Sequence, residues 1–209
     1  MTVKIARKKG KDEKRGLDDI SDWPGWIPFL ELYKKHEKAP YPEDSRTAFL
    51  LIFEGGFRAS EAIQIRKDQC KYNEYAIVIE KAPVLKKKEK TLRDVIIKLD
   101  EHNPLGYEFI DVIENTEGKY IFPKHTGFSR TYIPGEQSSR MSLYRRINEI
   151  GNLFPHSLRS YRAMMLVYER DFTVQQLVKW FEWTKADMAV HYTRTRDIAK
   201  SMGIKELPR

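Results

Sequence analysis

Three short helices are predicted between Pro155 and Tyr192, and the rest of the chain has to fold around them. Pro155 suits the first turn of a helix, where its missing N–H would have no partner in any case. His156 and Arg159 stand in an H-x-x-R spacing, one helical turn apart, so their side chains point the same way. We therefore expect one helix face to present an imidazole and a guanidinium together.

The second and third helices follow this segment directly. Apolar residues recur in the second helix at the i, i+3, i+4, i+7 spacing of one buried face, namely Val174, Leu177, Val178 and Phe181. Thr184 and Asp187 match a capping box that begins the third helix, which carries Tyr192 and is predicted to end at Gly203. Trp183 lies between the two helices. A phenol and an indole thus approach the arginine, an arrangement suited to a phosphodiester with Tyr192 as nucleophile.

A second arginine stands at a predicted turn. Arg58 closely follows a Gly-Gly pair, which ends an apolar helix predicted at residues 46–54 with Ser45 as its cap. Ser60 is predicted to cap the next helix. An arginine beside a helix N-terminus is a good phosphate clamp, because its guanidinium binds two oxygens while backbone N–H groups point the same way. Glu61 is placed to orient this arginine.

Each of these residues also has a simpler interpretation. Taken singly, Arg58 is as compatible with a surface ion pair, and Trp183 with core packing. Tyr192 is one of eleven tyrosines, most of which are expected in the core or at its rim. Tyr161 and Tyr168 are nearer the H-x-x-R motif, but they share one apolar helix face, which favours packing. The functional hypothesis therefore rests on the order and spacing of the whole set.

Charge narrows the choice of partner. The 209 residues carry a net charge of +8, which favours a polyanion, nucleic acid first and an anionic membrane surface second. Seven lysines and arginines fall within residues 1–16, against Asp12 and Glu13. This segment is predicted to be a basic, flexible tail that is either a linker or a DNA-gripping arm. Residues 17–209 are expected to form a single domain.

Cysteine usage and hydropathy predict a soluble, intracellular protein. Cys70 is the only cysteine, so an intramolecular disulfide is excluded. No apolar run approaches the ~18 residues of a transmembrane helix.

The middle of the chain is predicted to contain a small sheet. Residues 75–81 and 91–99 are rich in Ile and Val and are expected to pair as antiparallel strands, with a third short strand at residues 70–72. A helix is predicted after Pro104, residues 117–137 are expected to be mostly loop, and a further helix begins at Ser138 or Ser139. The expected fold is a mainly helical α+β domain with one three-stranded antiparallel sheet at its edge.

The order of these motifs resembles the catalytic domain of the tyrosine recombinases, the phage integrase family. The resemblance covers residues 17–203 and consists of G-F-R-A-S-E-A around Arg58, a hairpin whose first strand ends at Lys81, K-Y-I-F-P, P-H-S-L-R-S-Y-R-A around Arg159, and Trp183 nine residues before Tyr192. The position of Trp183 is histidine in many family members and tryptophan in others. The set is specific, although none of its motifs is specific alone.

The resemblance implies a site-specific DNA recombinase or integrase that cleaves and rejoins DNA through a 3′-phosphotyrosyl intermediate, with no metal or cofactor. The catalytic residues that it implies are Arg58, Lys81, His156, Arg159, Trp183 and Tyr192, with Glu61 in support. Tyr192 would be the nucleophile, Lys81 the general acid, and His156 the acceptor of the tyrosine proton.

The resemblance also implies the partners. DNA contacts are expected from Lys86, Lys87, Lys88, Lys90 and Arg93. Double-stranded DNA and further copies of the chain in a tetrameric synapse would be the partners, with no membrane. The expected location is the cytoplasm, at the nucleoid when the protein is bound to DNA.

Two departures from the family pattern leave alternatives open. The hairpin lacks the usual Gly-Lys-Gly, so Lys86 or Lys88 is an alternative to Lys81 as general acid. The chain has no room for the N-terminal helical domain that closes around DNA in the family, so it is expected to be an excised catalytic half or a naturally minimal protein. A type IB topoisomerase and a non-catalytic DNA-binding module remain as alternative functions.

Overall fold

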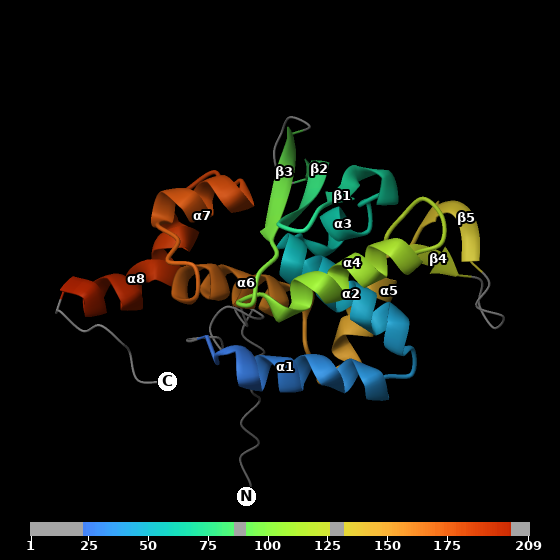
Figure 1. Cartoon of the computed structure of the whole chain (residues 1–209), viewed down its shortest axis with the longest axis horizontal. Coiled ribbons are helices and arrows are strands. Elements are labelled where there is room, and N and C mark those ends of the chain that lie inside the picture. Colours follow the sequence, from blue (N-terminus) through green and yellow to red (C-terminus); the bar gives the residue numbers. More distant parts are fainter. Residues whose placement is uncertain (1–22, 86–90, 126–131, 202–209) are drawn as a thin grey trace, which may run out of the picture.

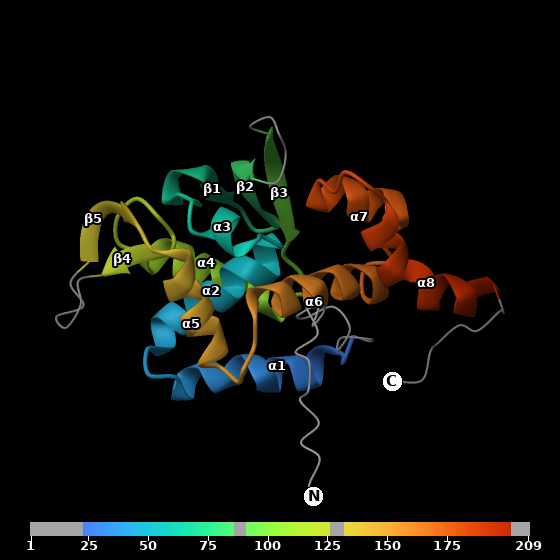
Figure 2. The same cartoon turned by 180° about the vertical axis from the view of Figure 1, so that it is seen from behind.

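The computed structural model describes residues 23–85, 91–125 and 132–201. The elements in chain order, with η for 3-10 helices, are α1 Trp26–Lys34, η1 Lys35–Lys38, α2 Pro42–Gly55, α3 Ala59–Ala62, η2 Lys67–Gln69, β1 Cys70–Tyr72, β2 Ala76–Val84, β3 Thr91–Lys98, α4 Pro104–Asn115, β4 Pro123–His125, β5 Tyr132–Gln137, α5 Arg140–Asn148, α6 Pro155–Tyr168, α7 Val174–Phe181 and α8 Asp187–Ser201. Figure 1 shows α6 running through the middle of the molecule, with α1 on one side of it and the three-stranded sheet on the other. Helices α7 and α8 lie at one end and β4 and β5 at the opposite end (Figures 1 and 2). The predicted α+β fold is confirmed.

Helix α2 forms the centre of the core because its stretch at residues 48–53 is apolar on every side. Residues 48–53 are all fully buried, and the helix packs against α4, α5 and α6. Pro42 occupies the first turn, so the helix begins before the predicted cap. Ser45 lies inside the helix and is buried, so its prediction as a cap was wrong. Gly56 ends the helix in the left-handed conformation at φ +55°, as predicted.

The three-stranded sheet has the order β1-β2-β3 and is antiparallel throughout. All three strands were predicted, although β2 runs three residues further than expected, to Val84. Ile79 pairs with Val95, but the next pair is Ala82 with Arg93, so β2 contains one extra residue. Lys81 lies in this bulge at φ +52°. The bulge therefore changes which side chains of β2 face the core.

Three further predictions about local structure were wrong. Residues 117–137 contain strands β4 and β5, which pair with each other; short strands of this kind depend on pairing that local sequence does not report. Arg58, not Ser60, is the N-cap of α3. The first hydrogen bond of α8 runs from Val190 to the carbonyl of Ala186, so Thr184 does not cap that helix.

The predicted tail at residues 1–16 and the helix end at Gly203 lie outside the described residues. Among the described residues, no helix combines the length and the apolar character needed to cross a bilayer.

Candidate active site

A pocket of about 820 Å³ opens between α3, α6 and the segment that joins α7 to α8. Five of the six predicted catalytic residues line it: Arg58, His156, Arg159, Trp183 and Tyr192. They come from three separate parts of the chain, which the packing of α6 against α2 and α8 brings together. These five residues therefore form one cluster in space.

Arg58 is fixed by a buried carboxylate. Glu61 is 1% exposed, and it accepts hydrogen bonds from the backbone N–H of Arg58 at 2.9 Å and from its Nη1 at 2.7 Å. The same carboxylate accepts a longer bond from the N–H of Leu85, at the end of β2. A guanidinium has five donors, so Arg58 keeps donors for an anion in the pocket while Glu61 sets its orientation. The predicted orienting role of Glu61 agrees with this geometry.

Arg159 lies one turn after His156 on α6 and is 5% exposed. Its Nη1 donates to the carbonyl of Gly56 and lies 3.8 Å from a Glu61 oxygen, and its guanidinium carbon lies 4.7 Å from the ring centre of Phe181. Its Nη2 is buried and has no hydrogen-bond partner among the described residues. Burial lowers the pKa of Arg159, and repulsion from Arg58 and Arg93 lowers it further. An anion in the pocket would relieve both effects.

Tyr192 and Trp183 form one wall of the pocket as stacked rings. Tyr192 is 6% exposed and lies 5.9 Å from Trp183 between ring centres, and Trp183 lies 4.6 Å from Phe181. The hydroxyl of Tyr192 donates to Ser160 Oγ at 2.9 Å. Burial raises the pKa of Tyr192, while Ser160 and Arg159 lower it. In this state the phenol is held against α6.

The other two tyrosines near the H-x-x-R motif pack as predicted. The ring of Tyr161 lies 6.3 Å from Trp23 and 5.4 Å from Phe29, within the aromatic core. Tyr168 is half-buried against the same core. His156 is half-buried near the start of α6 and lines the pocket.

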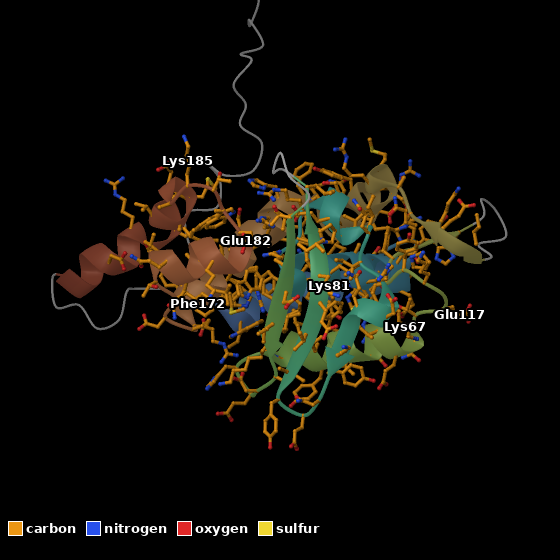
Figure 3. All side chains as sticks on the ribbon, turned by 90° about the horizontal axis from the view of Figure 1, so that it is seen from above. Lys67, Lys81, Glu117, Phe172, Glu182 and Lys185 are labelled. Atoms are coloured by element: carbon orange, nitrogen blue, oxygen red, sulfur yellow. The ribbon has the colours of Figure 1, made fainter. Side chains whose placement is uncertain are left out.

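The structure does not bring Lys81 into the pocket. Lys81 is exposed, it does not line the pocket, and its N–H donates to Asp94 at 2.8 Å. Figure 3 shows it over the sheet, away from Glu182 and Lys185 on the α7–α8 side. The cause is the bulge, which turns Lys81 outward and puts Ala82 on the buried face.

The predicted DNA contacts Lys86, Lys87, Lys88 and Lys90 lie outside the described residues. Two of them, Lys86 and Lys88, are also the alternatives to Lys81 as general acid. Val84, the last residue of β2, lines the pocket.

Arg93 is not on the surface where a DNA contact was predicted. It is 6% exposed and donates to the carbonyls of Trp180, Gly55 and Gly56, behind the pocket. Alternation along β3 explains this, because Arg93 shares a face with Val95 and residue 97, both buried. This two-residue period was visible in the sequence and was the signal that the prediction missed.

The pocket also contains residues that the sequence analysis did not select. Arg140 and Tyr144 line it from α5, and Lys185 lines it from the α7–α8 connection. Ser139 caps α5 through a bond from the N–H of Ser142, as predicted, which puts Arg140 at the start of that helix. A cap followed by arginine was therefore the available signal for Arg140. Lys185 carried no such signal.

A search of curated proteins gives no match. The chain is similar in structure to the XerH site-specific recombinase bound to its palindromic difH substrate in a post-cleavage complex (TM-score 0.60, 17% identity, 90% of this chain and 54% of that one). It is also similar to the XerA recombinase (TM-score 0.56, 15% identity, 86% and 63%) and to a lambda integrase dimer bound to a COC′ core site (TM-score 0.54, 19% identity, 87% and 48%).

These structural likenesses concern the fold, and the chain spans only about half to two thirds of the length of those three proteins. The sequence profile of the phage integrase family matches residues 29–198, which is most of the chain and includes the whole pocket constellation. The chain therefore belongs to the phage integrase family.

Proposed function

We propose that this protein is a site-specific DNA recombinase that cleaves and rejoins DNA through a 3′-phosphotyrosyl intermediate. The observation that carries the proposal is the pocket itself, in which two guanidiniums, an imidazole, an indole and a phenol converge. Membership of the phage integrase family supports the same reaction class. The partner would be double-stranded DNA, and the active assembly several copies of the chain on DNA, in the cytoplasm.

The reaction uses side chains of the chain alone. The oxygen of Tyr192 attacks the scissile phosphorus, and the bond from phosphorus to the 5′ oxygen breaks. The tyrosine proton passes to His156, and a lysine of the hairpin gives a proton to the departing 5′ oxygen. Arg58 and Arg159 stabilise the charge on the non-bridging oxygens of the transition state. Attack by a 5′-hydroxyl on the phosphotyrosine reverses these steps and rejoins a strand.

The buried state of the phenol fits a nucleophile that waits for its substrate. The bond from Tyr192 to Ser160 holds the hydroxyl against α6. Nη2 of Arg159, which has no hydrogen-bond partner in the part of the chain that the structure describes, provides a donor for a phosphate oxygen nearby. A phosphate bound by Arg159 and Arg58 would bring a hydrogen-bond acceptor and a negative charge close to the hydroxyl of Tyr192. The nucleophile is thus kept from water until DNA fills the pocket.

The test begins with selection of the DNA site from random duplexes. A nicked duplex that carries this site should trap the wild-type chain covalently, because the short strand beyond the cleavage point is lost. Tyr192→Phe removes only a hydroxyl, so it should bind the duplex normally and trap none. Digestion and mass analysis of the trapped complex should find the nucleotide on Tyr192, and EDTA should not prevent trapping.

Other outcomes lead to other functions. A nucleotide on a different tyrosine, or trapping that EDTA abolishes, would contradict the proposal. Retardation of DNA without any trapping would indicate a DNA-binding module. Relaxation of supercoiled plasmids that lack the selected site would indicate a topoisomerase.

We propose that the general acid is a lysine of the hairpin. Because Lys81 lies outside the pocket, its alternatives Lys86 and Lys88 are favoured, and a substrate with sulfur at the 5′ bridging position can tell the three apart. A thiolate leaves without a proton, so loss of the general acid, worth ~10²–10⁴ in rate, should matter only for ordinary DNA. The variant that is slow on ordinary DNA and nearly normal on the sulfur substrate marks the residue. Lys185→Ala belongs in the same series, because Lys185 lines the pocket. If Lys81→Ala is normal on both substrates, Lys81 is not the acid.

A further inference from the structure

A third guanidinium lies behind the pocket, on β3. The guanidinium carbon of Arg93 lies 5.3 Å from the ring centre of Phe57 and 5.4 Å from that of Trp180. Its Nη1 donates to the carbonyl of Trp180, and its Nη2 donates to Gly55 at 3.2 Å and to Gly56 at 3.4 Å. A buried charge destabilises a fold unless acceptors surround it. Arg93 occupies a strand position whose neighbours on the same face are apolar. The question is therefore why backbone carbonyls are arranged around a charge at this position.

These carbonyls belong to two segments that each lead to residues lining the pocket. The first is the arginine turn, residues 55–58, which ends in Arg58. The second is the end of α7, which contains Trp180. It leads into the α7–α8 connection, residues 182–186, which contains Trp183. One guanidinium bonds to both segments and joins them to β3.

Gly56 is the point at which these contacts meet. Its carbonyl accepts from Arg93 and also from Arg159. Its φ is +55°, and a Cβ at this position would lie 2.4 Å from the ring of Trp180. The arginine turn and α7 are therefore packed as closely as a glycine allows, and the two guanidiniums share one acceptor at that contact.

We infer that Arg93 is a positioning residue that sets the spacing between the phosphate clamp, on the arginine turn and α6, and the α7–α8 connection that leads to Tyr192. The inference rests on the proposed function. A planar guanidinium can direct donors to Trp180 on one side and to the glycine carbonyls on the other. A lysine ammonium is a single point of charge and cannot hold the same two directions at once.

The charge of Arg93 also contributes to the pocket. Burial lowers the pKa of Arg93, and repulsion from Arg58 lowers it further, against attraction from Glu61 and Glu182. Together with Arg159, this makes three guanidiniums near two carboxylates. Glu61 is fully buried and Glu182 is half-buried. Positive charge is in excess, so an anion in the pocket should stabilise the folded chain. Inorganic sulfate is a suitable probe because it is not cleaved.

The experiment uses the full chain and the variants Arg93→Lys and Arg93→Met. The matched control is Lys98→Met, which removes a cation from the same strand at a side chain that is 71% exposed. Three quantities are measured for each protein: the free energy of unfolding, the rise in unfolding midpoint with inorganic sulfate, and the single-turnover rate of covalent trapping at saturating nicked duplex. Rates are compared at a temperature where every variant is folded.

Arg93→Lys should bind the duplex as the wild type does but trap it ~10²-fold more slowly, the loss that a small misplacement of reacting groups produces. Both Arg93 variants should gain less stability from sulfate, and Lys98→Met should match the wild type. Because Arg93 and Arg159 share the Gly56 carbonyl, their losses should not add. Arg93→Lys should therefore slow the Arg159→Lys variant much less than ~10²-fold.

Several results would overturn the inference. Wild-type trapping by Arg93→Lys would do so, as would losses that add with those of Arg159→Lys. If neither Arg93 variant folds at any temperature, Arg93 is a core residue and not a positioning residue. If the wild type itself traps no DNA, the proposed function fails separately. The sulfate measurement then decides, and an equal rise in midpoint for Arg93→Lys and the wild type would overturn the inference.

Discussion

The hydroxyl of Tyr192 shows how single neighbours control a nucleophile. Burial raises its pKa. The Ser160 hydroxyl and the charge of Arg159 lower the pKa, because the phenolate can accept a hydrogen bond from that hydroxyl when it turns and is attracted by the guanidinium. A phenol whose pKa exceeds ~10 is almost entirely protonated at neutral pH. The rate of attack therefore depends on how strongly these two neighbours oppose the effect of burial.

Ser160→Ala should raise the pKa of Tyr192 because it removes one of these two neighbours. The phenolate fraction at a given pH falls as the pKa rises, so trapping at neutral pH should slow by about five-fold for a hydrogen bond worth ~1 kcal/mol. The rising limb of the rate should move to higher pH, which single-turnover rates measured across pH will test. The control is Thr193→Val, which removes a buried hydroxyl without a hydrogen-bond partner among the described residues. A pH profile unmoved by Ser160→Ala would count against this account.

At the scale of elements, the end of α2 packs closely against α7 at Gly56. Gly56→Ala combines two costs there: the left-handed backbone, ~1–2 kcal/mol for an L-residue, and the clash of Cβ with the Trp180 ring. Gly135→Ala in β5 carries the first cost alone, because its φ is +76° and nothing lies within 4 Å of a Cβ. Urea unfolding should show a larger loss of free energy for Gly56→Ala, by at least ~1 kcal/mol. Equal losses would mean that α7 moves aside freely.

At the scale of the whole molecule, the charge is unevenly distributed along the chain. Residues 1–16 hold seven lysines and arginines against two acidic residues, so their net charge is +5. The chain as a whole has a net charge of +8, so most of the excess lies in this segment. We propose that this basic tail increases affinity for DNA without reading sequence, because lysine and arginine charges neutralise the phosphates of any sequence, whereas specificity requires contacts with base edges.

Deletion of residues 1–16 should then weaken binding to all duplexes by the same factor. The slope of log K against log salt should become shallower by up to about six, since each neutralised phosphate contributes ~0.9. Titration of selected and unrelated duplexes at several salt concentrations measures both effects. An unchanged slope would make the tail a linker, and a loss confined to the selected duplex would make it a reader of sequence.

Much of the site could be predicted from local spacing. His156 and Arg159 face one way because a helix repeats every 3.6 residues, and Arg58 lies at a turn because Gly56 can adopt a positive φ. Wrong starts for α2, α3 and α8 had little effect on the site. Each of these helices was predicted to begin at a serine or threonine, the residues that commonly cap helices. In the structure, α2 begins at Pro42 and α3 follows Arg58.

The errors that matter arise where strands pair. Lys81 was predicted to lie in the site, but one extra residue in β2 turns its side chain outward. A β-bulge of this kind has no local sequence pattern from which it could be predicted. Arg93 was assigned to DNA from its charge, while its alternation with Val95 indicated the buried face. The alternation of buried and exposed residues along β3 could be read from the sequence, but the prediction gave more weight to the charge of Arg93.

The sequence by itself determined the helices, the order of the motifs and the residue types of the pocket, because periodicity, turns and chemical character are local properties. Only the tertiary structure decided that Ser160 holds Tyr192 and that Arg93 and Arg159 share the carbonyl of Gly56. Those contacts join elements that are distant in the chain or depend on the angle at which helices pack. Their geometry follows from how the whole core fills space, and no segment encodes it alone.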